Sequence, residues 1–293
     1  MANVDIQTTS SRIGIGCNTW LWVSPFRDRD IGLIERIASF GFDSVTVPIE
    51  QPGDFDPGRV RAAADQYGLR VHATGAYSAD RDLTHDDPDI RATALRYIEQ
   101  AALIASEMGA SLLVGPAYSA TGKRRHIPES QRHLEWQRAV EGLGLAGDTV
   151  ARYGLRIAVE PLNRFETDLV NTVSQGIDLI DTVNHDHIQL HLDTFHAHIE
   201  EKDLYNAIVQ AGDRLVYVDA SECDRGTPGS GQIDWRGLKA GLNAIGYRGD
   251  CVIETFTPDC VTIAAAAAIW RPLAPSQDVI AKDGLQFLQQ LLH

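Results

Sequence analysis

A regular alternation of short apolar runs with longer amphipathic segments is the feature that most constrains the fold of this chain. The first run, "RIGIGCNTW", predicts a strand, and "DIGLIERIASFG" predicts a helix with Ile34 and Ile37 on one face that ends at Gly41. The same pairing repeats along the chain as far as a closing helix near "VIAKDGLQFLQQLL". The pattern therefore predicts eight strands, each followed by a helix.

Eight strand–helix units in this length predict an α/β protein with a single (β/α)8 TIM barrel over residues 1–293, in which residues 1–10 are expected to be flexible. No linker rich in Pro, Gly or Ser divides the chain, and a hydrophobic content of 44% can fill one large core. A doubly wound sheet is the alternative, but "CNTWLW" stands where such a fold usually carries a G-x-G-x-x-G turn. Polar loops are expected at residues 79–89 and 118–133, over the mouth of the barrel.

Charge and composition exclude several classes of function. The formal net charge is −14 and Lys and Arg are scattered, which argues against nucleic acid as a partner. No apolar run reaches the ~18 residues of a membrane-spanning helix, and no signal peptide is readable. The four cysteines show no zinc-site or C-x-x-C spacing and are interpreted as reduced thiols. These features predict a cytoplasmic protein with a small-molecule ligand and no membrane partner.

Acidic side chains stand at the ends of four successive predicted strands. Glu160, Asp193, Asp219 and Glu254 each follow an apolar run, and in a barrel the carboxyl ends of all strands meet at one mouth. Any one of them is also compatible with a helix N-cap or a solvated loop. Four together would repel one another unless a divalent cation binds among them, and oxygen ligands suit Mn²⁺, Mg²⁺ or Co²⁺.

Three further polar residues lie just past strands five, six and seven. Glu166, His196 and Arg225 are placed to hydrogen-bond the hydroxyl groups of a sugar-like substrate held at that ion. A surface position for His196 and a salt-bridge role for Arg225 remain open alternatives.

Four segments of the chain resemble a known family. "VEPLNRFETDLVNT", "QLHLDTFHAHIEE", "SECDRGTPGSGQIDW" and "VIETFTPD" are similar, in matching order, to segments of the ketose 3-epimerases, the D-tagatose and D-allulose 3-epimerases of the xylose-isomerase-like superfamily. The resemblance implies a (β/α)8 barrel, a sugar substrate, a homodimer or homotetramer, and a divalent metal, usually Mn²⁺ or Co²⁺. It also implies that Glu160 and Glu254 are metal ligands and the acid/base pair, that Asp193 is a third ligand, and that Glu166, His196 and Arg225 contact substrate.

The chain departs from this family at the fourth metal ligand. Where relatives carry H-x-H or V-H, this chain reads "YVDASECDRG", so Asp219 occupies the position of the metal histidine and Tyr217 that of the preceding histidine. Four carboxylates around one dication leave a charge of about −2 instead of −1 and weaken the ion as a Lewis acid. A harder metal, a changed reaction or a weakened site are the three outcomes to distinguish.

The reaction implied by the resemblance is inversion at C3 of a free ketose through an enediolate, with Glu160 and Glu254 as acid and base. A related isomerase, a dehydratase or a lyase subunit acting on C-glycosides would use the same barrel. A sugar-binding protein with weakened catalysis is the alternative from a different class. A nuclease of the endonuclease IV type would need more metal histidines and a basic face than this chain carries.

Overall fold

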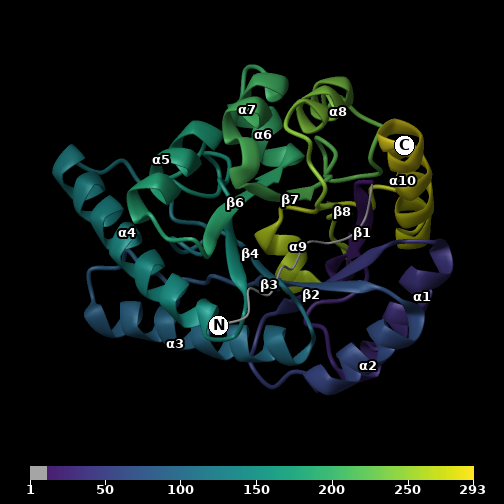
Figure 1. The fold of residues 1–293 in the computed structure, drawn as a ribbon, viewed down its shortest axis with the longest axis horizontal. Coiled ribbons are helices and arrows are strands. Elements are labelled where there is room, and N and C mark those ends of the chain that lie inside the picture. The colour runs from purple at the N-terminus through teal and green to yellow at the C-terminus, as the bar shows by residue number, and fades with distance from the viewer. Residues whose placement is uncertain (1–11) are drawn as a thin grey trace.

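A closed barrel of eight parallel strands, in the order β1 to β8, forms the centre of the molecule (Figure 1). The computed structural model describes residues 12–293, so the expected flexible segment 1–10 lies outside the described residues. The strands are β1 (Gly14–Asn18), β2 (Ser44–Ile49), β3 (Arg70–Gly75), β4 (Leu112–Gly115), β5 (Arg156–Val159), β6 (Ile188–Asp193), β7 (Leu215–Asp219) and β8 (Asp250–Ile253). The predicted TIM barrel is confirmed, and the doubly wound sheet is excluded because β1 pairs with both β2 and β8.

Helices surround the barrel on its outer side, except that the short helix α9 (Val261–Ala266) overlies its centre in this view (Figure 1). They are α1 (Gly32–Phe40), α2 (Pro57–Tyr67), α3 (Pro88–Glu107), α4 (Glu129–Ala151), α5 (Val173–Val183), α6 (Thr194–Glu200), α7 (Leu204–Ala211), α8 (Trp235–Ala244), α9 (Val261–Ala266) and α10 (Gln277–Leu292). The predicted end of α1 is confirmed, because Gly41 caps it in the left-handed region at φ 99°, which glycine adopts without a Cβ clash. Among these helices, none is long and apolar enough to cross a membrane.

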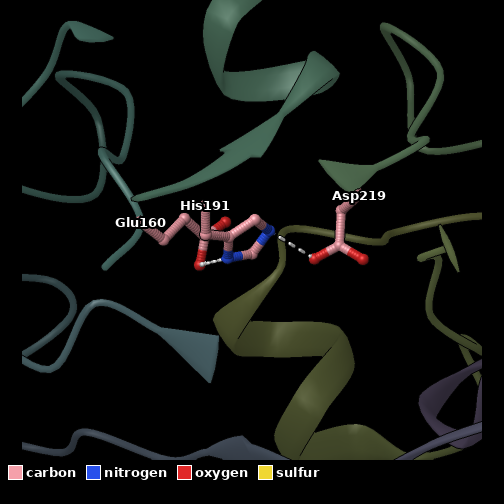
Figure 2. A group of neighbouring side chains, drawn as sticks. All are labelled: Glu160, His191 and Asp219. Carbon is pink, nitrogen blue, oxygen red and sulfur yellow. Dashed lines mark ion pairs between the residues drawn. The ribbon is translucent and has the colours of Figure 1, made fainter. Parts of the chain in front are cut away.

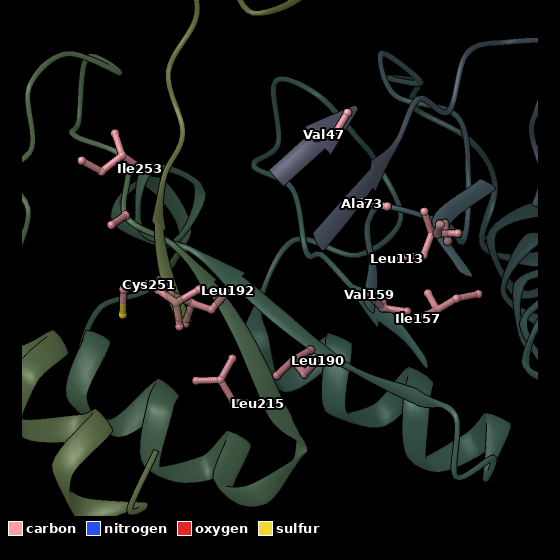
Figure 3. Close-up of a cluster of buried hydrophobic side chains, with 14 of the residues drawn as sticks. Val47, Ala73, Leu113, Ile157, Val159, Leu190, Leu192, Leu215, Cys251 and Ile253 are labelled. Atoms are coloured by element: carbon pink, nitrogen blue, oxygen red, sulfur yellow. The ribbon is translucent and has the colours of Figure 1, made fainter. Parts of the chain in front are cut away.

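The apolar core lies between the barrel wall and the helices. Figure 3 shows the strand side chains that point outward into it: Val47, Ala73, Leu113, Ile157, Val159, Leu190, Leu192, Leu215, Cys251 and Ile253. A smaller cluster fills the inside of the barrel, made of Leu112, Val114, Ala158, Tyr217 and Val252. Strands buried on both faces read as continuous apolar runs, which is why the sequence pattern located them.

Three parts of the helical layer differ from the predictions. Helix α4 begins at Glu129, so the expected loop 118–133 is shorter than predicted. Helix α6 starts directly after β6, because the Asp193 side chain caps it by accepting a hydrogen bond from the backbone N–H of Phe195 at 2.8 Å. Helix α9 packs Ala264 into a small apolar cluster with Trp20 and Phe256. Both short helices follow strands that carry candidate site residues.

An ionic cluster occupies the inside of the barrel at the N-terminal ends of the strands. Asp250 forms a salt bridge with Arg70 and lies 2.7 Å from Nε2 of His72. Gly14 leaves the space for this cluster, because a Cβ there would lie 2.0 Å from Oδ1 of Asp250 and 2.1 Å from Nη2 of Arg70. This end of the barrel is held by charge pairing, and the opposite end carries the candidate site.

Candidate metal centre

The four predicted carboxylates lie at the C-terminal end of the barrel, and all are buried. Glu160 directly follows β5, Asp193 ends β6, Asp219 ends β7, and Glu254 directly follows β8. Asp193 and Asp219 are direct partners in the register of β6 and β7. Like charges at such a position repel each other, so the pair needs a proton or a cation nearby.

Burial acts on all four groups, and repulsion by a neighbouring carboxylate acts on three of them. Burial and then the charge of Glu254 raise the pKa of Glu160 well above its ordinary value. Burial and then the charge of Asp219 raise the pKa of Glu254 in the same way, and burial and then Asp193 raise that of Asp219. The pKa of Asp193 is raised chiefly by burial. Without a cation the cluster therefore retains protons, whereas a bound dication would favour the carboxylate forms.

Two groups of possible ligands share Glu160. In the first, Glu160 meets His191 and Asp219: Nδ1 of His191 lies 3.7 Å from Oε2 of Glu160, and its Nε2 lies 2.9 Å from Oδ2 of Asp219 (Figure 2). In the second, Nε2 of His196 lies 3.6 Å from Oε1 of Glu160 and 3.6 Å from Oδ2 of Asp193. The structure thus brings three of the four predicted carboxylates together with two imidazoles.

Unpartnered polar atoms test whether these residues fit a metal ion. Within residues 12–293, the buried atoms that lack a hydrogen bond include both ring nitrogens of His191, Oδ2 of Asp193 and Oδ1 of Asp219. Buried polar atoms are normally satisfied, and each orphan costs free energy. Carboxylate oxygens and neutral imidazole nitrogens are donors for a divalent cation, so the residues present fit one.

Glu254 lies outside both ligand groups. Its Oε1 accepts a hydrogen bond from Nδ2 of Asn18 at 3.3 Å, and the Asn18 side chain is in turn oriented by the N–H of Trp20 at 3.0 Å. Its charge nevertheless raises the pKa of Glu160. Asn18 is a site residue that the sequence reasoning missed.

His191 was also missed, although the sequence carried a signal for it. In β6, "IQLHLD", apolar residues alternate with Gln189, His191 and Asp193. Successive strand residues point to opposite faces, so His191 shares the inward face with Asp193. The ring is fully buried, and burial lowers its pKa to about 3. A neutral imidazole thus lies beside the carboxylates.

The three predicted substrate contacts lie next to one another beside the carboxylates. Nη1 of Arg225 donates to Oε1 of Glu166 at 3.3 Å, and Nη2 lies 3.3 Å from Nε2 of His196. The guanidinium also stacks over the ring of Phe195, 4.0 Å from its centroid. His196 is buried, which leaves the surface-loop interpretation without support. Arg225 thus forms a salt bridge with Glu166 and also lies beside the site, so both interpretations of this residue hold.

Glu222 organises the loop that carries Arg225, between β7 and α8. Its Oε1 accepts from the backbone N–H groups of Cys223, Gln232 and Ile233, and its Oε2 accepts from that of Gly229 and from Nε1 of Trp235. Five donors on one buried carboxylate hold both ends of the loop together. The sequence reasoning did not single out this residue.

Comparisons with known proteins decide the family. Residues 34–291 match the family described as xylose isomerase-like TIM barrel. A probable ketose 3-epimerase of Synechocystis sp. is 32% identical over 282 residues, which cover 96% of this chain and 98% of that protein. This chain belongs to the ketose 3-epimerase family. It is accordingly an enzyme of the sugar isomerase and epimerase class.

Other members of the ketose 3-epimerase family agree in sequence and structure. An L-ribulose 3-epimerase of Methylomonas sp. is 32% identical, over 88% of this chain and 90% of that protein. The crystal structure of a D-allulose 3-epimerase from Methylomonas sp. superposes with a TM-score of 0.90 at 31% identity, covering 96% of this chain and 98% of the other. A D-psicose 3-epimerase structure from Clostridium cellulolyticum, solved with D-tagatose, gives 0.88 at 27% identity and covers 96% of this chain and the whole of the other.

Proposed function

We propose that this protein is a divalent-metal-dependent epimerase that inverts C3 of a free ketose. The observation that carries the proposal is the cluster of buried carboxylates at the ends of β5 to β8, whose orphaned acceptor atoms fit a cation. Relatives named as ketose, L-ribulose and D-psicose 3-epimerases support the substrate class.

Glu160, Asp193, Asp219 and Glu254 would hold the ion, with Mn²⁺ as the expected metal and Co²⁺ or Mg²⁺ as substitutes. When bound, the ion polarises the ketose carbonyl and makes the hydrogen on C3 more acidic. The oxygen-rich donor set favours these harder cations over thiol-seeking metals.

Glu160 and Glu254 carry the proton transfers. They extend from β5 and β8, which are separated by two strands on one side of the closed barrel and by four on the other, so they approach a substrate in the mouth from different directions. One carboxylate takes the proton from C3 and leaves an enediolate, and the other group, as a carboxylic acid, gives a proton to the opposite face of C3. One proton leaves and one arrives, so the product is the C3 epimer.

The group formed by Glu166, His196 and Arg225 positions the sugar. Arg225 supplies N–H donors, Glu166 accepts from hydroxyl groups, and His196 points its Nε2 toward the carboxylates. Binding the hydroxyls at fixed positions orients the C3–H bond toward one of the glutamates.

Incubation with D-fructose, D-tagatose and L-ribulose tests the proposal, using protein stripped with a chelator and then reloaded with Mn²⁺. We expect the C3 epimer only in the reloaded sample, with one deuterium at C3 when the reaction runs in D₂O. Deuterium at C1 or C2, or an aldose product, would indicate a 1,2-isomerase instead. Stoichiometric Mn²⁺ without turnover of any ketose would refute C3 epimerisation of these sugars.

The variants Glu160→Gln and Glu254→Gln separate the two proton transfers. Each should abolish epimer formation, because an amide neither takes nor gives the proton at C3. Exchange of the C3 hydrogen with D₂O should persist in each variant for the epimer that faces the remaining glutamate. Metal content is measured alongside, and equal exchange of both epimers in either variant would contradict a two-glutamate mechanism.

A further inference from the structure

We infer that His191 is a metal ligand of this centre and supplies the imidazole that the chain lacks at position 219. The inference rests on the proposed metal-dependent function. It places the imidazole on β6 and a carboxylate on β7, whereas the family resemblance puts a histidine on β7.

The position of the ring is the first argument. His191 lies between Glu160 and Asp219, with one nitrogen facing each carboxylate (Figure 2). A neutral imidazole carries one N–H, so in either tautomer a lone pair faces a carboxylate oxygen. A cation shared by that nitrogen and that oxygen turns the repulsion into coordination.

The two distances assign the nitrogens. Nε2 and Oδ2 of Asp219 are 2.9 Å apart, a hydrogen-bond length, although the ring is not aligned well enough to form the bond. Nδ1 and Oε2 of Glu160 are 3.7 Å apart, too far for a hydrogen bond but within reach of two donors that each lie about 2.1 Å from one ion. Of the two pairs, only Nε2 and Oδ2 are close enough to share a proton, so we place the proton on Nε2 and leave the lone pair of Nδ1 for the ion.

His196 is the other imidazole beside Glu160, and its lone pairs are engaged. Its Nδ1 accepts the backbone N–H of Asn163 at 3.0 Å. In the neutral ring, its Nε2 then carries the proton. No lone pair of His196 is left for an ion, so of the two imidazoles in the ligand groups only His191 has one to offer.

Asp219 acquires a defined part in this arrangement. A histidine that binds a metal usually donates its other N–H to a carboxylate, which fixes the tautomer and the orientation of the ring. Oδ2 of Asp219 lies 2.9 Å from Nε2 of His191 and would accept its N–H once the ring is aligned, and the orphaned Oδ1 of Asp219 is left for the ion. Loss of the histidine at position 219 and the presence of one at 191 are thus parts of one arrangement.

Pulsed electron paramagnetic resonance of the Mn²⁺-loaded wild-type protein, labelled with ¹⁵N-histidine, tests the inference without relying on activity. We expect a coupling from one directly bound histidine nitrogen. Stoichiometric Mn²⁺ with no such coupling would overturn the role of His191 and leave the metal-dependent function standing. If no Mn²⁺ binds at all, the inference and the proposed function both fail.

His191→Gln and His196→Gln form the matched pair of variants, since both replace a buried imidazole beside Glu160. The nitrogen coupling should vanish in His191→Gln, with Mn²⁺ affinity at least about tenfold weaker, and should persist in His196→Gln. Circular dichroism checks that each variant folds. If either does not, the electron paramagnetic resonance spectrum of the wild-type protein remains the test. Loss of the coupling in His196→Gln but not in His191→Gln would show that His196 is the ligand and would overturn the inference.

Discussion

Asp250 secures the N-terminal end of the barrel through contacts with two side chains of one other strand, β3. It is 4% exposed and accepts hydrogen bonds from the Arg70 guanidinium, while Nε2 of His72 lies 2.7 Å away. Burial by itself raises the pKa of Asp250, but the contacts with His72 and Arg70 outweigh it and hold the pKa well below its usual range. The Asp250 carboxylate thus links β8 to β3 across the inside of the barrel.

The variant Asp250→Asn should lower the free energy of unfolding by about 3 kcal/mol at pH 7, because it leaves the Arg70 guanidinium without its buried carboxylate partner. The pKa of Asp250 is depressed in the folded state, so its contribution is complete above the unfolded value of about 3.9 and falls as the pH drops toward the folded value. At pH 3 the difference between wild type and variant should be smaller by about 1 kcal/mol. Urea unfolding at both pH values measures it, and an equal difference at pH 7 and pH 3 would contradict the assignment.

At the scale of elements, the loop between β7 and α8 depends on Glu222. The five N–H groups that donate hydrogen bonds to Glu222 come from both ends of the loop. Arg225, which lies between them, adopts a left-handed backbone conformation with φ 59°. Such a conformation is strained for a residue with a side chain and persists only where its surroundings hold it. Glu222 therefore acts through Arg225, as a positioning residue.

The variant Glu222→Gln should raise KM for the ketose more than it lowers kcat. Its amide NH₂ would meet N–H donors in place of an acceptor, which loosens the loop and displaces Arg225. Asp234→Asn is the control, because the Asp234 side chain caps α8 by accepting from the N–H of Gly237, which is not one of the five donors to Glu222. Steady-state kinetics measure kcat and KM for both variants. An equal change of KM in the two would indicate a general loss of stability and not a positioning role of Glu222.

At the scale of the whole molecule, the proposed metal binding would be coupled to folding. The buried carboxylates of β5 to β8 repel one another, and an ion that binds them only in the folded state stabilises the barrel by mass action. The four strands whose ends carry these groups form half of the barrel. Metal removal is therefore expected to affect the stability of the protein as well as its activity.

Mn²⁺ at one hundred times its Kd should raise the free energy of unfolding by about 2.7 kcal/mol. For a domain of this size, that corresponds to a rise in Tm of about 5 °C or more. Thermal unfolding followed by circular dichroism, with Mn²⁺ and then with excess chelator, measures the shift. Asp193→Asn, which keeps the size of the side chain, should show a smaller shift. A Tm that does not respond to Mn²⁺ in the wild type would argue against a metal centre.

Local sequence patterns determined most of the framework. The period of the apolar residues predicted the helix that carries Ile34 and Ile37 and ends at Gly41, and placed Glu160, Asp193, Asp219 and Glu254 at strand ends. These are properties of short segments, in which neighbouring residues and burial decide the backbone. Parallel strands in a barrel then bring their carboxyl ends to one mouth.

Contacts between strands were decided only by the tertiary structure. That His191 lies between Glu160 and Asp219 depends on the register of β5, β6 and β7 and on how far each side chain reaches across the barrel. Other contacts likewise join residues that are separated in the chain. They are the hydrogen bond from Asn163 to His196, the hydrogen bonds to Glu222 in its loop, and the packing of α9 against Trp20. Sequence periodicity reports which way a side chain points relative to its own strand. It does not report which atom of another strand it meets, because that distance is set by the closure of the barrel as a whole.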